Sequence, residues 1–293
     1  MLLIVGGSKD HNIHRLADAA MWRGMPHRVV FTDADPPPAV FWQPGESMLE
    51  INGETFDPAL TSLFIRYDVF GGGDDAAKAA FFEALRGWAA AHETVGMLNR
   101  GNENMDVSKP RALVLAQKCG FEIPRTCITG DFNRFSDRNA WIAKPVDGGA
   151  YTRVLSDMPD VSSARPWIVQ EKLAYPEMRI FRVGRHYFAF SISSPDIDYR
   201  NSDDFTLVEV DPPQEQVEAL QRLTDLLGLD YAAADFKTHP QTGRLLFLEV
   251  NTMPMFTAYD DAAQGRLSDA LALFLRGGAF SPKAAAKPAG PSL

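Results

Sequence analysis

A short apolar run near the C-terminus carries two polar side chains that constrain how the chain can fold. Residues 245–251 read Leu-Leu-Phe-Leu-Glu-Val-Asn, and Pro254 follows soon after. Because side chains alternate between the two faces of a strand, Phe247, Glu249 and Asn251 are predicted to share one face. A carboxylate embedded among apolar residues is costly to desolvate, so its presence here favours a functional role.

A second strand-like run, residues 231–238, has Asp235 at its middle. Residues 239–243 (His-Pro-Gln-Thr-Gly) have the composition of a turn, which predicts a hairpin. Pairing the two runs would bring Asp235 across from Glu249 and Asn251. Such a set of hard oxygen ligands suits Mg²⁺ that also holds substrate phosphates. The alternative interpretation is three polar residues on the solvent-exposed face of a hairpin.

Composition and charge restrict the class of protein. The chain has 293 residues, 45% hydrophobic and 23% charged, which is ordinary for a globular protein of two or three subdomains. Its net charge of −9 argues against a nucleic-acid partner, which would require basic patches. No apolar run approaches membrane-spanning length, and the N-terminus lacks signal-peptide features. Cys119 and Cys127 lack metal-ligand spacing, which indicates a reducing cytoplasm without a disulfide.

The first hundred residues alternate between predicted strands and helices. Strands are expected at 2–6, 27–32 and 62–67, helices at 14–22 and 75–91, and a hairpin at 50–56. This order with short links is typical of a small parallel α/β domain. Arg66-Tyr67-Asp68 at the end of the third strand is a candidate for substrate contacts, with a solvated strand end as the alternative.

The rest of the chain continues this mixed pattern. Helices are expected at 109–119, 214–227 and 267–274, and extended segments at 121–129, 141–144, 167–173, 179–183 and 186–192. The tail at 281–293 is rich in Ala, Pro and Lys and is expected to be disordered.

A lysine and a glycine pair indicate a phosphate site. Lys144 ends an apolar strand, and Gly148 and Gly149 follow it. A lysine on a rigid strand can neutralise phosphates, while a glycine-rich turn lets backbone N–H groups approach them. The alternative is an edge-strand lysine followed by a hairpin turn.

A polar crossover follows the strand that starts at Trp167. It comprises Gln170, Glu171, Lys172 and Leu173, and such a segment can present adenine with backbone donors and acceptors. Six residues after Glu171, the carboxylate of Glu177 could hold ribose hydroxyls.

Arg179 is predicted to share a strand face with Phe181 and Val183. Its guanidinium group could bind a phosphoryl oxygen or a substrate carboxylate there. Arg182 is predicted to point the other way, into solvent.

The order of these motifs resembles the ATP-grasp superfamily of carboxylate–amine ligases. The similarity is greatest to the branch with glutathione synthetase and the enzyme that adds glutamate to a ribosomal protein, and it spans residues 99–275. It implies an α/β chain in which a small parallel pre-grasp domain precedes a two-lobed α+β grasp domain. The expected boundaries are 1–98 for the pre-grasp domain, 99–168 for the central lobe with a phosphate lid, 169–280 for the C-terminal lobe with the metal site, and 281–293 for the tail.

The resemblance also implies roles for residues that bind the nucleotide. Lys109 and Lys144 would contact ATP phosphates, and the Gly148-Gly149 loop would close over them. The adenine pocket would be lined by Gln170, Glu171 and Leu173, with Lys172 in the same crossover, and the ribose would be bound by Glu177.

The remaining implied roles concern the metal and the transferred group. Asp235, Glu249 and Asn251 would hold two Mg²⁺ ions, with Glu249 bridging and Mn²⁺ as an alternative ion. Arg179 would face the transferred phosphoryl group. Asp198-Tyr199-Arg200 looks like the Asp-Trp-Arg stretch of peptide-modifying ligases in this superfamily, so Arg200 would touch the acyl phosphate or substrate carboxylate. The alternative for Arg200 is a surface-loop arginine.

The implied activity is ATP-dependent formation of an amide bond through an acyl phosphate. The substrate would be an amino acid, a small peptide or a peptide side chain. One alternative is a macrocyclase-type ligase that makes side-chain amides or esters in a peptide, and another is an ATP-binding regulator or scaffold without catalysis. The sequence does not name the donor, the acceptor or the oligomeric state, although the resemblance makes a homodimer one expected assembly.

Overall fold

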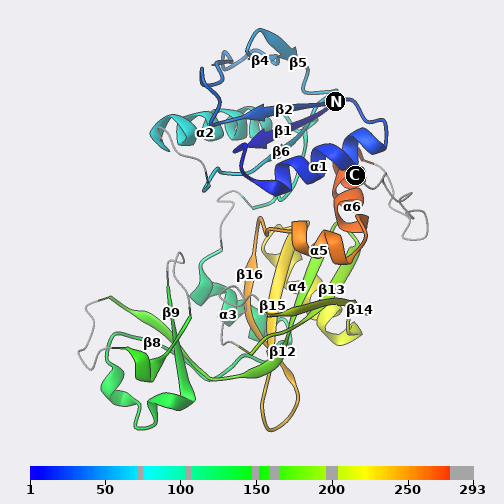
Figure 1. Ribbon diagram of the computed structural model, residues 1–293. Coiled ribbons are helices and arrows are strands. Elements are labelled where there is room, and N and C mark those ends of the chain that lie inside the picture. The colour runs from blue at the N-terminus through cyan, green and yellow to red at the C-terminus, as the bar shows by residue number, and fades with distance from the viewer. Residues whose placement is uncertain (71–74, 103–106, 147–151, 159–164, 196–203, 278–293) are drawn as a thin grey trace. The chain divides into compact units, whose positions relative to one another are not determined.

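The computed structural model describes residues 1–70, 75–102, 107–146, 152–158, 165–195 and 204–277 (Figure 1). The chain divides into two compact units. Unit 1 comprises Met1–Arg100, Val183–His186 and Met255–Leu293, and unit 2 comprises Gly101–Arg182 and Tyr187–Pro254. No helix among the described residues has both the length and the apolar character that crossing a membrane requires.

Unit 1 is built on a parallel sheet with the strand order β2-β1-β6-β7. Its strands are β1 (Leu2–Gly6), β2 (His27–Phe31), β6 (Ser62–Ile65) and β7 (Gly96–Met97). The central strand β1 is buried along its whole length, as a strand covered on both faces should be. A small antiparallel sheet is formed by β3 (Val40–Phe41), β4 (Leu49–Ile51) and β5 (Glu54–Phe56).

Helices cover the parallel sheet of unit 1. On one face α2 (Asp75–Ala91) buries Phe81, Leu85 and Trp88 against the sheet and the small antiparallel sheet. Helix α1 (His11–Trp22) packs against β1 and against α6 (Arg266–Leu275), and α5 (Thr257–Ala262) completes the unit. The segment from Met255 onward therefore groups with the N-terminal residues, whereas the sequence analysis placed it in the C-terminal lobe.

Unit 2 contains two antiparallel sheets. The first has the order β10-β9-β11-β8 and comprises β8 (Thr126–Thr129), β9 (Trp141–Pro145), β10 (Arg153–Val154) and β11 (Trp167–Glu171). Its three short 3-10 turns are η1 (Phe132–Arg134), η2 (Arg138–Ala140) and η3 (Leu155–Asp157). A core that includes Phe132, Phe135, Ala143 and Val169 fills one face of this sheet.

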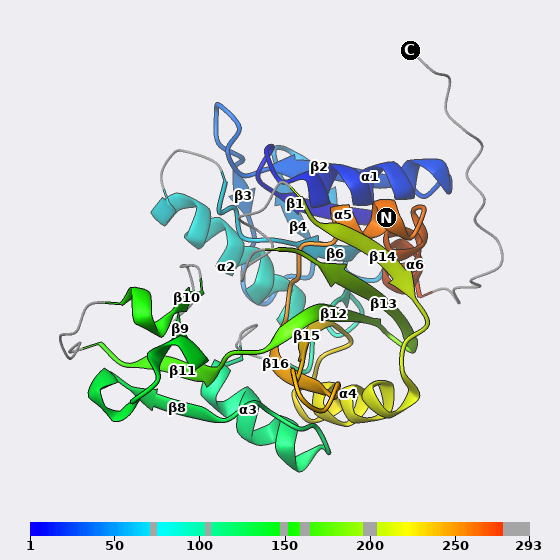
Figure 2. The same cartoon turned by 60° about the horizontal axis from the view of Figure 1, so that its bottom comes forward.

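The second sheet of unit 2 has five strands in the order β14-β13-β12-β15-β16. They are β12 (Ala174–Val183), β13 (His186–Ser193), β14 (Thr206–Val210), β15 (Tyr231–Thr238) and β16 (Leu245–Asn251). Helices α3 (Lys109–Lys118) and α4 (Gln214–Leu226) pack on one face and bury an apolar core (Figure 2). The other face carries the charged residues discussed below, which we call the site face.

A parallel α/β sheet followed by antiparallel sheets confirms the predicted fold class. The sequence analysis missed α5, the five-residue strand β14 and the two-residue strands β3, β7 and β10. The division of residues 99–280 into two lobes stays a prediction, and the tail at 281–293 lies outside the described residues.

Arg182 points away from the site face as predicted, but it is not solvated. Its guanidinium group binds Asp225 of α4 at 2.5 Å, and only 11% of its side chain is exposed.

Candidate active site

A β-bulge in the β15–β16 hairpin decides which side chains reach the site face. Asp235 pairs with Glu249, whereas the next residue, Phe236, pairs with Phe247. Leu248 is therefore an extra residue on β16. The bulge reverses the alternation of side chains, so Phe247 shares a face with Phe236 and Glu249 shares a face with Asp235.

Phe247 consequently lies in the core and not beside Glu249. Its ring centroid lies 5.1 Å from that of Phe121 and 5.8 Å from that of Phe236, and it is fully buried. The prediction that Phe247 shares a face with Glu249 and Asn251 is wrong for Phe247, because strict alternation does not allow for the bulge.

The predicted pairing of Asp235 with the polar end of β16 is confirmed. Asp235 pairs with Glu249 in the ladder, and Asn251 Nδ2 donates a hydrogen bond to Asp235 Oδ2 at 3.1 Å. Arg179 binds the same carboxylate with two bonds, from Nε to Oδ1 at 2.5 Å and from Nη2 to Oδ2 at 2.7 Å. Arg179 is thus held at the centre of the candidate site by a bidentate ion pair.

Glu249 lies between two lysines from different elements. Its Oε2 is 3.2 Å from Lys109 Nζ, at the start of α3, and 4.0 Å from Lys144 Nζ, on β9. Burial acts to raise the pKa of Glu249, but Lys144 and Lys109 outweigh it and lower the pKa to about 2. Burial also lowers the pKa of Lys144. The two lysines predicted to bind phosphates therefore converge on one candidate metal ligand.

Glu177 lies on β12 two residues before Arg179, and so it is on the site face. It pairs with Lys237, whose Nζ is 3.5 Å from Glu177 Oε2. Burial raises the pKa of Glu177 to about 7 although Lys237 opposes the shift. Sequence reasoning missed Lys237. Its position two residues after Asp235 on one strand was an available signal, because it places both side chains on the same face.

The end of β11 and the crossover that follows it carry a buried acceptor and a backbone donor that have no hydrogen-bond partner among the described residues. Gln170 is fully buried, and its Nε2 donates to Thr126 Oγ1 at 3.1 Å. Its Oε1 has no hydrogen-bond partner within the described part of the chain. The N–H of Leu173 likewise makes no hydrogen bond to any described residue.

The side chain of Glu171 binds Arg125 and therefore has partners, unlike the Gln170 acceptor. Its carboxylate accepts hydrogen bonds from Arg125 N at 2.9 Å and Arg125 Nε at 2.8 Å. Burial acts to raise the pKa of Glu171, and Arg125 lowers it overall. Glu171 therefore holds the crossover to the start of β8.

A pocket of about 500 Å³ adjoins this crossover. Its lining includes three predicted nucleotide-binding residues, Glu171, Lys172 and Leu173, and also the turn residues His239 and Pro240. The pocket does not extend to the charged residues of the site face.

Three predicted site residues lie outside the described residues. They are Gly148, Gly149 and Arg200. Their predicted roles in the lid and at the acyl phosphate therefore stay predictions.

The donor set of the site face fits Mg²⁺ that is shared with phosphates. Within the described ranges, no group of three or more His, Cys, Asp or Glu side chains is placed to hold a metal ion. The site face offers two carboxylates and one amide, Asp235, Glu249 and Asn251, all with hard oxygen atoms. Magnesium commonly takes one or two carboxylates and completes its shell with water and substrate phosphates.

Arg66 and Asp68 are buried in unit 1, so the interpretation of a solvated strand end is wrong. Arg66 Nε binds Asp10 Oδ2 at 2.7 Å, and Asp68 Oδ2 binds Lys78 Nζ at 2.7 Å. Arg66 and Asp68 follow β6, whereas Asp10 is the N-cap of α1 after β1 and Lys78 lies on α2 after β6.

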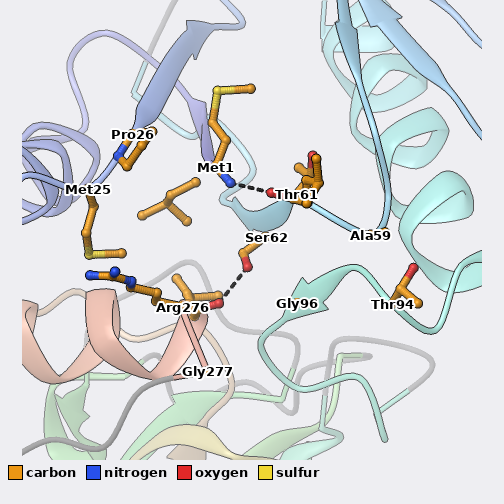
Figure 3. A pocket seen from close by; sticks show the side chains of 13 residues that line it. Met1, Met25, Pro26, Ala59, Thr61, Ser62, Thr94, Gly96, Arg276 and Gly277 are labelled. Carbon is orange, nitrogen blue, oxygen red and sulfur yellow. Dashed lines mark hydrogen bonds between the residues drawn. The ribbon is translucent and has the colours of Figure 1, made fainter.

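A pocket of about 430 Å³ lies at the opposite end of the same sheet (Figure 3). It is surrounded by the first residues of β1, β6 and β7 and by the end of α6. Across it, Ser62 Oγ donates to Leu275 O at 2.5 Å. Ligands of open parallel sheets bind at the carboxyl ends of the strands, so we assign this pocket no role in the reaction.

Comparison with known proteins identifies the fold. No protein-family model matches the sequence, and no curated protein sequence matches it. Solved structures with the same fold include ATP-grasp ligases, and the chain has the ATP-grasp fold that its motifs predicted.

Three of the solved structures with this fold are complexes with a precursor or with peptides. PsnB, an ATP-grasp ligase complexed with a phosphomimetic variant of its minimal precursor, Mg and ADP, is 22% identical with a TM-score of 0.74 over 94% of this chain and 97% of that chain. A RiPP-associated ATP-grasp ligase from Chryseobacterium gregarium, with ADP and a leader and core peptide, is 23% identical with a TM-score of 0.75 over 94% and 96%. The macrocyclase MdnC from Microcystis aeruginosa MRC, bound with precursor peptide MdnA, is 20% identical with a TM-score of 0.73 over 94% and 99%.

Proposed function

We propose that this protein is an ATP-dependent ligase that joins a carboxylate to an amine and releases ADP. The observation that carries the proposal is the convergence at the site face of cations and hard oxygen ligands from five elements, α3, β9, β12, β15 and β16. Its cations are Arg179, Lys109 and Lys144, and its oxygen ligands are Asp235, Glu249 and Asn251.

The crossover supplies complementary groups for an adenine base. Gln170 Oε1 could accept a hydrogen bond from the exocyclic amine of adenine, and the Leu173 N–H could donate one to a ring nitrogen. Glu177 would accept hydrogen bonds from the ribose hydroxyls.

Asp235, Glu249 and Asn251 would hold Mg²⁺, which when bound neutralises charge on the phosphates during phosphoryl transfer. Lys109 and Lys144 would contact the phosphates. Complexes of the structural neighbour PsnB with Mg and ADP support this arrangement.

In the proposed reaction a substrate carboxylate attacks the γ-phosphorus of ATP and forms an acyl phosphate, and ADP leaves. An amine then attacks the acyl carbon, and phosphate leaves to give an amide. Arg179 and Lys144, which pair with the candidate metal ligands, would stabilise the charge that spreads over the phosphoryl oxygens in the first step. A loop at Gly148 and Gly149 would exclude water from the acyl phosphate.

The substrate we favour is a peptide. The neighbours PsnB, MdnC and the Chryseobacterium gregarium ligase are complexed with precursor, leader or core peptides, which supports this substrate class. The macrocyclase-type reaction, with side-chain amides or esters as products, is the second candidate on the same observation. In either case Arg200 would bind the acyl phosphate or the substrate carboxylate.

Calorimetry with ATP and Mg²⁺ tests the proposal. The wild type should bind, and Glu249→Ala and Lys144→Ala should each weaken binding at least about tenfold, because each removes a charged contact. Lys118→Ala, which removes an exposed lysine of α3, is the matched control and should bind like the wild type.

Release of ADP then separates a ligase from an ATP-binding regulator. A ligase should release ADP when it is offered amino acids or peptides with free carboxylates and amines. Tight ATP binding without ADP release from any of them would favour the regulator, and no ATP binding at all would refute the proposal.

Two further expectations belong to the same proposal. A cytoplasmic location is supported by two cysteines that are both free thiols. A homodimer stays the expected assembly, and light scattering in solution would test it.

A further inference from the structure

Lys237 is a largely buried cation that the proposed reaction does not use. It follows Asp235 by two residues on β15, and only 12% of its side chain is exposed. A lysine is rarely so buried unless a partner compensates its lost hydration. Its position on the site face therefore requires an explanation.

Glu177 and Tyr175 both contact the Lys237 ammonium group. Glu177 Oε2 lies 3.5 Å from Nζ, and Nζ also lies 4.2 Å from the ring centroid of Tyr175. A cation over an aromatic face gains a further attraction when it is shielded from water. Glu177 and Tyr175 are both on β12, so Lys237 connects β15 to the strand that carries the predicted ribose ligand.

Lys237 favours the charged form of Glu177. The Glu177 side chain is also only 12% exposed, and a buried carboxylate takes up a proton unless a cation opposes it. The charged groups that act on Glu177 are Lys237 and Asp235 from β15 and Arg179 from β12. Arg179 forms a bidentate pair with Asp235, and Lys237 contacts Glu177 directly.

We propose that Lys237 is a positioning residue for the nucleotide sugar, because it holds the Glu177 carboxylate charged and oriented to accept hydrogen bonds from both ribose hydroxyls. The inference rests on the proposed function and deepens it by naming the residue that acts through Glu177. An ionised carboxylate is an acceptor only, whereas a protonated one also donates and loses part of its acceptor capacity. Sugar recognition should therefore require the cation as well as the carboxylate.

A role in stability alone would not affect discrimination between sugars. The test compares the affinity for ATP with that for 2′,3′-dideoxy-ATP, which lacks both hydroxyls, by calorimetry with Mg²⁺ at about pH 8. The proteins are the wild type, Lys237→Met, Glu177→Gln and the double variant. Lys118→Met is the matched control, since Lys118 is an exposed lysine of the same unit.

The wild type should prefer ATP over the dideoxy analogue by about tenfold, the usual scale for a hydrogen bond to a charged group. Lys237→Met should reduce this preference to about twofold or less by weakening ATP binding, as should Glu177→Gln. The double variant should lose no more than either single variant, because both act through the same hydrogen bonds. Lys118→Met should behave like the wild type.

The outcomes distinguish this inference from the proposed function. If the wild type binds ATP but Lys237→Met keeps the full preference, the inference is overturned while the proposed function stands. Equal binding of both nucleotides by the wild type would have the same consequence. If the wild type binds neither nucleotide, both the proposed function and the inference are overturned. Lys237→Gln, neutral and polar, provides the same comparison if Lys237→Met does not fold.

Discussion

Opposite charges are matched residue by residue on the site face. Asp235 has Arg179, Glu249 has Lys109 and Lys144, and Glu177 has Lys237. These pairs differ in how well they compensate burial. The lysines lower the pKa of Glu249 to about 2, whereas burial raises the pKa of Glu177 to about 7 in spite of Lys237. Neighbouring carboxylates on one sheet therefore titrate far apart.

Glu177 should make stability depend on pH. Because the pKa of Glu177 is about 7 in the folded chain, above the ordinary 4.5 of a glutamate, the folded state binds the proton more tightly, and stability is lost as pH rises between these values. Replacement with glutamine removes this loss. Relative to the wild type, Glu177→Gln should gain about 2–3 kcal/mol in the free energy of unfolding between about pH 5 and pH 8. Urea denaturation at both pH values measures this difference. If the free energy of unfolding changed equally with pH in both proteins, the raised pKa of Glu177 would be contradicted.

The buried ion pair in unit 1 should contribute strongly to stability. Asp10 and Arg66 are 2% and 7% exposed, and loss of Arg66 would leave a buried carboxylate unpaired. Arg66→Met should lower the free energy of unfolding by about 3–5 kcal/mol, as for other broken buried pairs. Arg134→Met is the control, because Arg134 is 75% exposed and its pair with Asp131 should contribute at most about 1 kcal/mol. Equal losses in chemical denaturation would refute the prediction.

At the scale of elements, the sequence predicted nearly every long helix and strand. Their amphipathic patterns are local, so they can be found without the fold. The missed α5 is only six residues long, too short for its periodicity to show, whereas the Thr-Leu-Val-Glu-Val alternation of β14 was an available signal. The bulge at Leu248 could not be predicted, because it depends on the register of β15 and β16.

The bulge makes a specific prediction for Phe247. Because Phe247 lies in the core, Phe247→Ala should lower the free energy of unfolding by about 3–5 kcal/mol. The substitution removes a ring that packs against Phe121 and Phe236. Phe41→Ala, at a 65% exposed position, should cost less than about 0.5 kcal/mol. Urea denaturation measures both. A small loss at Phe247 together with weaker ATP binding would instead place it beside Glu249.

At the scale of the whole chain, sequence reasoning identified the fold and most of the candidate site, but not how the site residues pair with each other. The motifs gave the order of the ligands along the chain. Contacts such as Arg179 with Asp235 join residues far apart in sequence, and a single sequence carries no record of such pairing. Lys237 was missed for the same reason, since its significance comes from Glu177 on another strand.

The paired carboxylates predict how ligands should stabilise the whole protein. Because Asp235 and Glu249 are already held by Arg179 and Lys109, Mg²⁺ alone should give little rise in Tm. ATP and Mg²⁺ together should raise the free energy of unfolding by about 2.7 kcal/mol at a ligand concentration 100 times Kd. Thermal melts with each ligand separately and with both measure this effect. A full rise in Tm with Mg²⁺ alone would show that the carboxylates are available without the nucleotide.

The ion pairs of the site face have a consequence for the working cycle. A cluster of carboxylates with no counter-charges would repel itself and would need a bound metal to fold. Here the chain carries its own counter-ions, so the folded state does not depend on its ligands. In the proposed reaction, loading the site would be an exchange of partners, in which arginine and lysine would pass from carboxylate to phosphate as the metal took their place. Product release would reverse the exchange, so that the charges of the site would stay balanced throughout.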